Sequence, residues 1–456
     1  MAAAIIAVMK TDAEYEHKPY VGDVGNSLDT ATEKAGVTLA MVVLALVVGF
    51  VIGLAVWAVF RASTLLTNLL WVDARGALAG MLDGAGVPSA WLPLAFCIVG
   101  GAVIGLFTWK FGGAPKALME VLGTVKKTGG YKFEHPVASV IGFLLPLVFG
   151  GSIGPEAGLT GLIAAACTKI GSTLKAAGLR VKGVADLTVS AALSAVFATP
   201  FVGIVATAQD AMPAADPKDY DFRRKAKLVL YTASALGAVG GIMLLGALLG
   251  DEGGLPRFDG VTPSDVKLLW GIPCIAVGYA GALLFNVGEC VFKRASVALG
   301  ERPILKPVIA GAIIGILAVP LPLVLFPGEE QATELMQTWQ TLGAAVLLCT
   351  GLLKCLATPL CLNFGWNGGH FFPLIFAGIA AGYGIACISG VDPMFCVAIT
   401  TATLVAGAQR NALVALALLL LCFPVRSLVW MGIACLVGAT LPMPSALFKT
   451  PKPKER

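Results

Sequence analysis

Charged residues are scarce in this sequence, and the scarcity excludes a soluble globular protein. Only 13% of the 456 residues are Asp, Glu, Lys or Arg, against about 25% in a soluble domain, whereas 57% are hydrophobic. Apolar runs cover residues 36–60, 228–250 and 342–362. Each is long enough for a hydrocarbon core that needs about 20 residues. The sequence therefore predicts a multi-pass protein of the cell (inner) membrane with the lipid bilayer as a partner.

Histidine is nearly absent, and the cysteines do not pair in sequence. The chain has 3 His and 11 Cys, and no two Cys form a CxxC motif. Isolated cysteines in apolar surroundings are typical of small buried hydrophobic side chains. We therefore expect no metal site, no disulfide framework and no cofactor.

The few charges are unevenly distributed along the chain. The net charge is only +5, which does not indicate a nucleic-acid partner. Acidic residues dominate segments 251–265 and 329–334, while basic residues gather in segments 110–132, 169–182, 223–227, 293–306 and 449–456. Because basic loops stay on the cytoplasmic side, the C-terminus is predicted to be cytoplasmic.

The order of apolar and polar segments predicts two halves of similar plan. We expect a polar N-terminal cytoplasmic segment at 1–35, a first transmembrane repeat at 36–227, a second at 228–448 and a basic tail at 449–456. No CBS or other soluble domain is expected. Short apolar runs bounded by Gly and Pro, at 136–150, 371–388 and 394–408, favour helices that stop within the membrane.

Two glycine pairs, each with a proline four positions after the second glycine, predict helix starts. One is Gly150 to Glu156 and the other is Gly368 to Pro373, and Phe111 to Pro115 is a weaker third case. Glycine permits close backbone approach, and proline suits the first position of a helix. The free N–H groups at such a start attract an anion, most effectively where little water competes. We therefore expect the helix starts to face one anion site.

These motifs resemble those of the CLC family of chloride channels and chloride/proton exchangers. Four pieces occur in the family's order: FGGAP at 111–115, GSIGP at 151–155, FATPFVG at 197–203, and KxxxT followed by GGHFFP from 354 to 373. The resemblance implies an all-α polytopic fold of two inverted-topology repeats with broken and re-entrant helices, usually a homodimer. It also implies bound chloride or another small anion at Gly112, Gly113, Ala114, Ile153, Gly154, Phe371, Phe372 and Pro444.

Several side chains depart from the family pattern. Ile153 stands where the family has its gating glutamate, Gly112 replaces the central serine and Pro444 the central tyrosine. Asp210 aligns with the inner proton-transfer glutamate. Glu156 follows Pro155 in the first turn, where a carboxylate either caps the helix dipole or acts as a displaced gate. The sequence leaves both roles open.

Four functions are compatible with these residues. Because Ile153 cannot titrate, passive or weakly proton-coupled anion transport leads. A proton-coupled exchanger using Glu156 and Asp210 is the alternative within transport. A non-transporting sensor or scaffold would explain the missing side chains. Ser152 and His370 could in principle act as nucleophile and base of an enzyme. No orienting acid accompanies them, so we expect no enzymatic activity. The sequence does not identify the preferred anion, since backbone N–H donors bind different small anions by similar chemistry.

Overall fold

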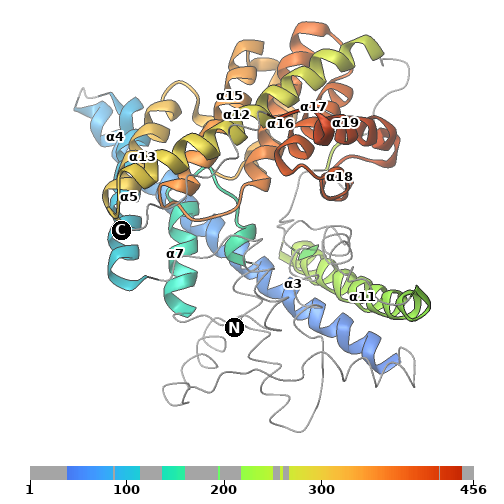
Figure 1. Ribbon diagram of the computed structural model, residues 1–456. Helices are drawn as coiled ribbons and strands as arrows, with labels where there is room; N and C mark the ends of the chain where they lie inside the picture. Colours follow the sequence, from blue (N-terminus) through green and yellow to red (C-terminus); the bar gives the residue numbers. More distant parts are fainter. Residues whose placement is uncertain are drawn as a thin grey trace, which may run out of the picture.

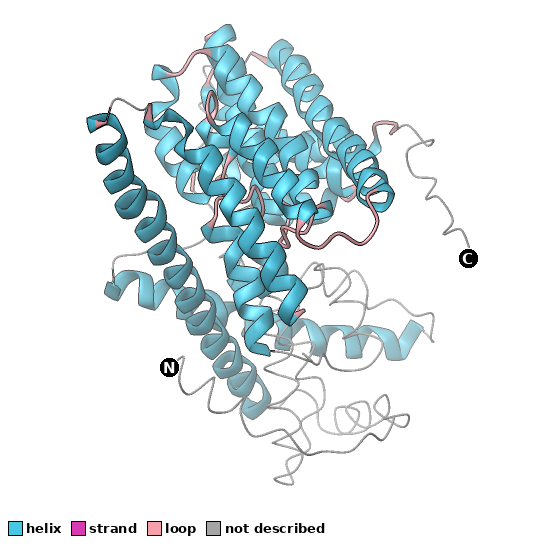
Figure 2. Ribbon diagram, turned by 90° about the vertical axis from the view of Figure 1, so that its left-hand side faces the viewer, coloured by secondary structure: helices cyan, strands magenta, loops and turns pink. Residues whose placement is uncertain are grey.

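The computed structural model describes residues 39–85, 88–112, 136–159, 194–195, 217–249, 257–259, 267–420 and 422–443. Helices account for nearly all of these residues, and no strand is drawn among them (Figure 2). In the first half of the chain the helices are α3 (Leu39–Asn68), the π-helical turn η1 (Leu69–Ala74), α4 (Arg75–Gly84), η2 (Ser89–Trp91), α5 (Leu92–Phe111), α7 (Pro136–Val148) and α11 (Pro217–Leu249).

The remaining helices form the larger part of the described structure (Figure 1). They are η4 (Leu268–Trp270), α12 (Gly271–Ala298), α13 (Leu305–Ala318), η5 (Pro322–Val324), α14 (Glu329–Thr338), η6 (Trp339–Thr341), α15 (Ala344–Asn363), α16 (Phe371–Ser389), α17 (Pro393–Gln409), α18 (Ala412–Leu419), η7 (Val425–Ser427) and α19 (Leu428–Thr440). The all-α fold that the resemblance implied is confirmed.

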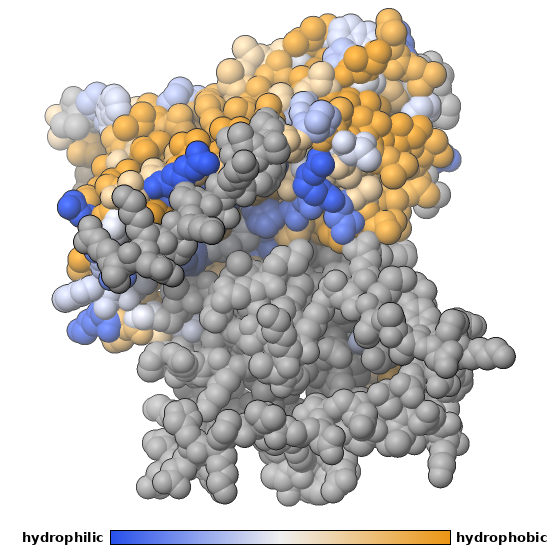
Figure 3. Space-filling model, viewed as in Figure 1, coloured by the Kyte–Doolittle hydropathy of each residue, from blue (hydrophilic) through white to orange (hydrophobic). Residues whose placement is uncertain are grey.

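Six helical segments in the described residues are long and apolar enough to cross a membrane. They are Val42–Gly84, Ser89–Phe111, Val229–Leu249, Leu268–Ala298, Ala344–Asn363 and Phe371–Ser389. Large hydrophobic side chains such as Leu249, Ile272 and Val429 are exposed, and hydrophobic residues cover much of the described surface in Figure 3. This apolar exterior fits a lipid surrounding, in agreement with the predicted multi-pass membrane protein.

Each of the three short runs bounded by Gly and Pro contains a helix. The first run contains α7, which ends at Val148, and the two later runs form α16 and α17. Because α16 is long enough to cross a membrane, the expectation that these helices stop within it stays a prediction. α16 is buried over 89% of its most apolar stretch, so protein rather than lipid surrounds it. It packs tightly on α17, where a Cβ on Gly378 would lie 2.5 Å from Thr401 Cα.

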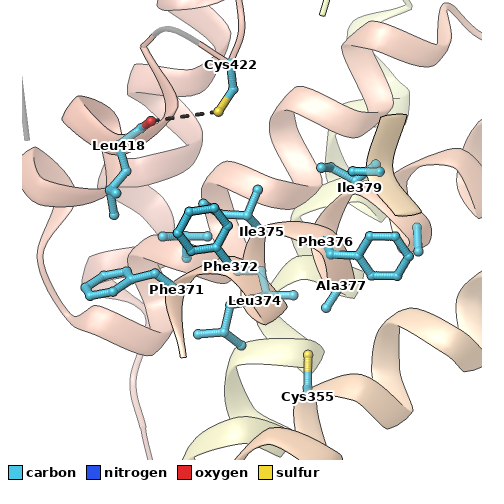
Figure 4. Packing of buried hydrophobic residues seen from close by; sticks show 14 of the residues in the cluster. Cys355, Phe371, Phe372, Leu374, Ile375, Phe376, Ala377, Ile379, Leu418 and Cys422 are labelled. Atoms are coloured by element: carbon cyan, nitrogen blue, oxygen red, sulfur yellow. Dashed lines mark hydrogen bonds between the residues drawn. The ribbon is translucent and has the colours of Figure 1, made fainter. Parts of the chain in front are cut away.

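The core of the described structure lies around the first turns of α16. Figure 4 shows Phe371, Phe372 and Phe376 of this helix among other buried hydrophobic side chains, with Cys355 of α15 close by. Across from them, the Cys422 thiol donates a hydrogen bond to the carbonyl of Leu418, with 3.8 Å between sulfur and oxygen. The beginning of α16 is therefore held from several sides.

Parts of the predicted domain plan fall outside the described residues, namely the N-terminal segment 1–35 and the tail 449–456. α11 begins at Pro217 and continues past the predicted boundary at residue 228. The division into two repeats stays a prediction.

Glycines form the seam between α3 and α11. A Cβ on Gly53 would lie 2.1 Å from the carbonyl oxygen of Ala238, and one on Gly237 would lie 2.1 Å from that of Leu46. Helix pairs in lipid use small residues in this way to bring their backbones together. No side chain larger than hydrogen fits at these two positions without separating the helices.

We expect Gly53→Val to destabilise the protein by about 1–3 kcal/mol, because the added side chain forces the two helices apart. Gly76→Val is the matched control, since Gly76 is also helical but a Cβ there would meet nothing within 4 Å. Unfolding in detergent by titration with a denaturing surfactant would measure both variants. An equal loss in the two would mean that β-branching within a helix, rather than the seam, is responsible.

Candidate anion site

The two glycine-rich turns lie side by side and hydrogen-bond to each other. The N–H of Gly154 donates to the carbonyl of Gly369 at 2.8 Å, and the N–H of Gly369 donates to the carbonyl of Gly154 at 2.7 Å. The pair forms an isolated antiparallel bridge. Because both segments lead into helices, the bridge brings the first turn after Pro155 next to the start of α16.

Glu156 places its carboxylate at the start of α16. The side chain is fully buried, and its Oε1 accepts a hydrogen bond from the backbone N–H of Phe371 at 2.7 Å. A negative group at a helix start is stabilised by the free N–H groups and the helix dipole. Here one carboxylate uses the beginnings of two helices.

The glycines of the bridge leave little space around this carboxylate. A Cβ on Gly154 would lie 1.9 Å from Glu156 Oε2, and a Cβ on Gly369 would lie 2.0 Å from Glu156 Cδ. Both distances are far below van der Waals contact. The two turns therefore form a cradle, defined here as residues 153–156 together with residues 368–371, and the Glu156 carboxylate fills it.

The residues predicted to bind the anion occupy different positions relative to the cradle. Ile153, Gly154, Phe371 and Phe372 belong to it or border it, and all four are buried. Ile153 packs against Gly368, where a Cβ would lie 2.6 Å from Ile153 Cδ1. Of the predicted backbone donors, Gly154 N–H is used by the bridge and Phe371 N–H by Glu156. The Glu156 carboxylate therefore uses one of the N–H donors that the sequence analysis assigned to the anion.

Gly112 lies apart in the described structure. It is exposed at the end of α5, where its N–H donates to the carbonyl of Thr108 at 3.0 Å, and its φ is 60°. No heavy atom of the described chain would lie within 4 Å of a Cβ at this position. Gly113, Ala114, Asp210 and Pro444 lie outside the described residues.

The aromatic side chains next to the cradle are part of the core. The Phe371 ring stacks on the His370 ring with centroids 4.7 Å apart, and the Phe372 ring lies 6.5 Å from that of Phe60 on α3. The backbone and the side chains of Phe371 and Phe372 therefore have different roles. The side chains pack in the core at the start of α16, while the N–H of Phe371 donates to Glu156 in the cradle.

Ser152 and His370 have different hydrogen-bond partners. The Ser152 hydroxyl lies 3.3 Å from the Thr358 hydroxyl, whereas His370 Nε2 lies 2.6 Å from the Gln409 side-chain nitrogen. Neither of these contacts couples the serine to the imidazole as nucleophile and base require. They are better explained as a link from the first turn to α15 and a link from the second turn to the end of α17.

Sequence reasoning missed two residues that support the first turn. The indole N–H of Trp71 donates to the carbonyl of Val148 at 2.8 Å, and a Cβ on Gly150 would lie only 2.9 Å from the Trp71 ring. Phe326 contacts the same indole edge-on at 5.1 Å. No local pattern marks these residues, because each acts on a segment distant in sequence. Gln409, which contacts His370, could have been noticed in the sequence, because its polar side chain interrupts a long apolar run.

Comparison with known proteins supports the fold and the family. The family described as voltage gated chloride channel matches residues 95–442. A protein of Escherichia coli O7:K1 (strain IAI39 / ExPEC), named "Putative ion-transport protein YfeO", is 22% identical over 343 residues, which cover 74% of this chain and 77% of that protein. A protein of the same name from Shigella boydii serotype 4 (strain Sb227) is also 22% identical, over 344 residues.

Two solved structures resemble the chain over most of its length. A slow cyanobacterial Cl⁻/H⁺ antiporter has a TM-score of 0.68 at 19% identity, covering 88% of this chain and 94% of that one. A CLC-type fluoride/proton antiporter has a TM-score of 0.64 at 18% identity, covering 89% and 96%. Since the family match extends over most of the sequence and the fold agrees, the chain belongs to the voltage-gated chloride channel (CLC) family.

Proposed function

We propose that the protein carries chloride or a similar small anion across the cell membrane, with Glu156 as the gate of the anion site. The observation that supports this is the hydrogen bond from Phe371 N–H to the Glu156 carboxylate inside the cradle. An anion that loses water there needs the same donors, so the carboxylate and the anion compete. Protonation of Glu156 removes its charge and lets the anion replace it.

The position of Glu156 favours proton-coupled exchange over passive permeation. The passive alternative rests on Ile153, which cannot titrate. Glu156 supplies a titratable group in the same cradle, and such a group can hold a proton when the anion has displaced it. The two solved relatives described as proton antiporters make this coupling a reasonable proposal for this chain. Asp210 remains the proposed inner proton-transfer residue.

The wider setting follows from the family and from the charge pattern. We propose a homodimer in the inner membrane, with one pathway per subunit, two inverted repeats and a cytoplasmic C-terminus. No nucleic acid, metal or cofactor is needed for such transport. A sensor or scaffold without flux remains a distinct alternative, because it predicts no permeation at all.

Anion efflux from liposomes, recorded together with internal pH, tests the proposal. We expect the purified protein to release loaded chloride from the liposomes. Exchange requires that protons move in the opposite direction, into the liposomes. Series with fluoride and nitrate would define the preferred anion. Absence of flux for all three would contradict anion transport, and anion flux without proton movement would support the passive alternative.

A further inference from the structure

Lys354 carries a buried ammonium group that none of the functions above explains. It lies in α15, is fully buried, and its Nζ lies 3.2, 3.1, 2.9 and 2.8 Å from the carbonyl oxygens of residues Leu323, Val324, Leu325 and Phe326. The ammonium also lies 4.8 Å from the centre of the Phe376 ring. No carboxylate among the described residues is within ion-pair distance. A lysine at membrane depth is costly and marks a functional role by default.

The carbonyls around Lys354 belong to a turn that contacts Gly150, in the segment that leads into the cradle. The turn includes the end of η5, and its last residue is Phe326, a non-glycine residue with φ at 62°. Phe326 N–H donates to the carbonyl of Gly150 at 3.1 Å. A left-handed backbone is unfavourable for a bulky residue and persists only where its surroundings hold it. The four carbonyl contacts of Lys354 supply such a hold, and through Phe326 they reach Gly150.

A second connection runs from the backbone of the same lysine. The Thr358 hydroxyl donates to the Lys354 carbonyl at 3.0 Å and is paired with the Ser152 hydroxyl at 3.3 Å. Ser152 and Thr358 are both fully buried, so water does not compete for these bonds. Lys354 thus holds Gly150 through its side chain and Ser152 through its carbonyl, which are the two ends of the glycine turn that leads to Glu156.

We propose that Lys354 is a positioning residue for the gate: it fixes the Gly150–Ser152 turn so that the Glu156 carboxylate reaches the N–H groups of α16. This inference rests on the proposed function. Because Gly154 and Gly369 leave almost no free space around the carboxylate, a small shift of the turn changes how well it fits. The competition between carboxylate and anion then depends on Lys354, although the lysine does not touch either one.

Lys354→Met tests the proposal, because methionine keeps an unbranched side chain and removes the ammonium donors. Chloride flux would be measured against pH and against chloride concentration. When the turn shifts, the hydrogen bond between the Glu156 carboxylate and the Phe371 N–H becomes weaker. We therefore expect the pH midpoint of flux to shift by about one unit and the apparent KM for chloride to change about tenfold. Combining it with Glu156→Gln should abolish the pH shift, since the lysine acts through that carboxylate.

Thr350→Val is the matched control for this helix. Thr350 lies one turn before Lys354, is buried, and its hydroxyl has no hydrogen-bond partner among the described residues. Valine has nearly the same shape, so flux and its pH profile should stay as in the wild type. If the Lys354→Met protein has the same flux and the same pH profile as the wild-type protein, only the positioning role is overturned. If the wild-type protein itself carries no anion flux, the proposed function is overturned.

Removal of a buried cation can prevent folding, so a milder variant is needed as well. Lys354→Gln is uncharged but keeps two N–H donors for the carbonyls of the turn. Size-exclusion profiles would establish that each variant is folded. If Lys354→Met does not fold, a pH shift in Lys354→Gln supports the proposal. A wild-type pH profile in a folded Lys354→Gln protein then contradicts it.

Discussion

Replacing Glu156 with glutamine is expected to raise anion flux and to make it independent of pH. The wild-type carboxylate accepts a charge-assisted hydrogen bond from Phe371 N–H inside the cradle. Such bonds contribute about 1.5–3 kcal/mol, so neutralising the acceptor shifts the competition toward the anion by about 10- to 100-fold. In the wild type we expect acidification to protonate Glu156 and to increase flux. In Glu156→Gln no proton is needed, and chloride efflux from liposomes should follow the same time course from acid to neutral pH.

Glu330→Gln provides the control for this experiment. Glu330 lies in the first turn of α14 and accepts a hydrogen bond from the Thr64 hydroxyl at an exposed site. It undergoes the same chemical change away from the cradle, so its flux and pH profile should match the wild type. A Glu156→Gln protein that behaves like Glu330→Gln would leave Glu156 as a dipole cap and would remove the basis for a displaced gate.

The helical fold could be predicted because its signals are local. Apolar runs of membrane length, and shorter runs bounded by Gly and Pro, each lie within one segment of the sequence. α7, α16 and α17 were predicted in this way, and their observed bounds differ from the apolar runs by at most two residues. The family motifs added the expectation of two inverted repeats with broken and re-entrant helices. Composition alone would not have distinguished this fold from other polytopic helical proteins.

The role of Glu156 could not be predicted, because the deciding contact is not local. Its position after Pro155 is compatible with a cap on its own helix and with a gate. The structure shows a hydrogen-bond partner 215 positions away, at the start of a different helix. A cap needs only the first turn of its own helix. The contact with α16 therefore supports the gate, and it could be found only by bringing the two turns together.

Lys354 was visible in the sequence as part of a motif, yet its acceptors were not. They are backbone carbonyls of four consecutive residues about 30 positions earlier, and backbone groups leave no trace in residue identity. Trp71 and Phe326 were not predicted either, because an aromatic residue in an apolar run is usually only part of the core. The sequence locates the elements that carry charge or special geometry, while the contacts that join them depend on the fold.

The substitution Gly369→Ala is expected to force the Glu156 carboxylate out of the cradle. A Cβ at this position would lie 2.0 Å from both Cδ and Oε1 of Glu156, and its nearest neighbours all belong to that side chain. Gly369 does not have a positive φ, so alanine can adopt the backbone and the clash is the main effect. Overpacking of this kind costs about 1–3 kcal/mol, which a denaturation curve in detergent would measure. Flux should also lose most of its pH dependence.

Shortening Glu156 to alanine should relieve this clash, which makes the pair a test of the cradle geometry. In the Glu156→Ala background, Gly369→Ala should cost less than in the wild type by about 0.5–3 kcal/mol. Gly368→Ala is the control: its Cβ would meet Ile153 at 2.6 Å rather than Glu156, so its cost should be the same in both backgrounds. Equal costs for Gly369→Ala in the two backgrounds would show that the carboxylate does not occupy the space between the turns. A coupling confined to Gly369 would place the carboxylate inside the cradle, because only a group there can compete with alanine for that volume.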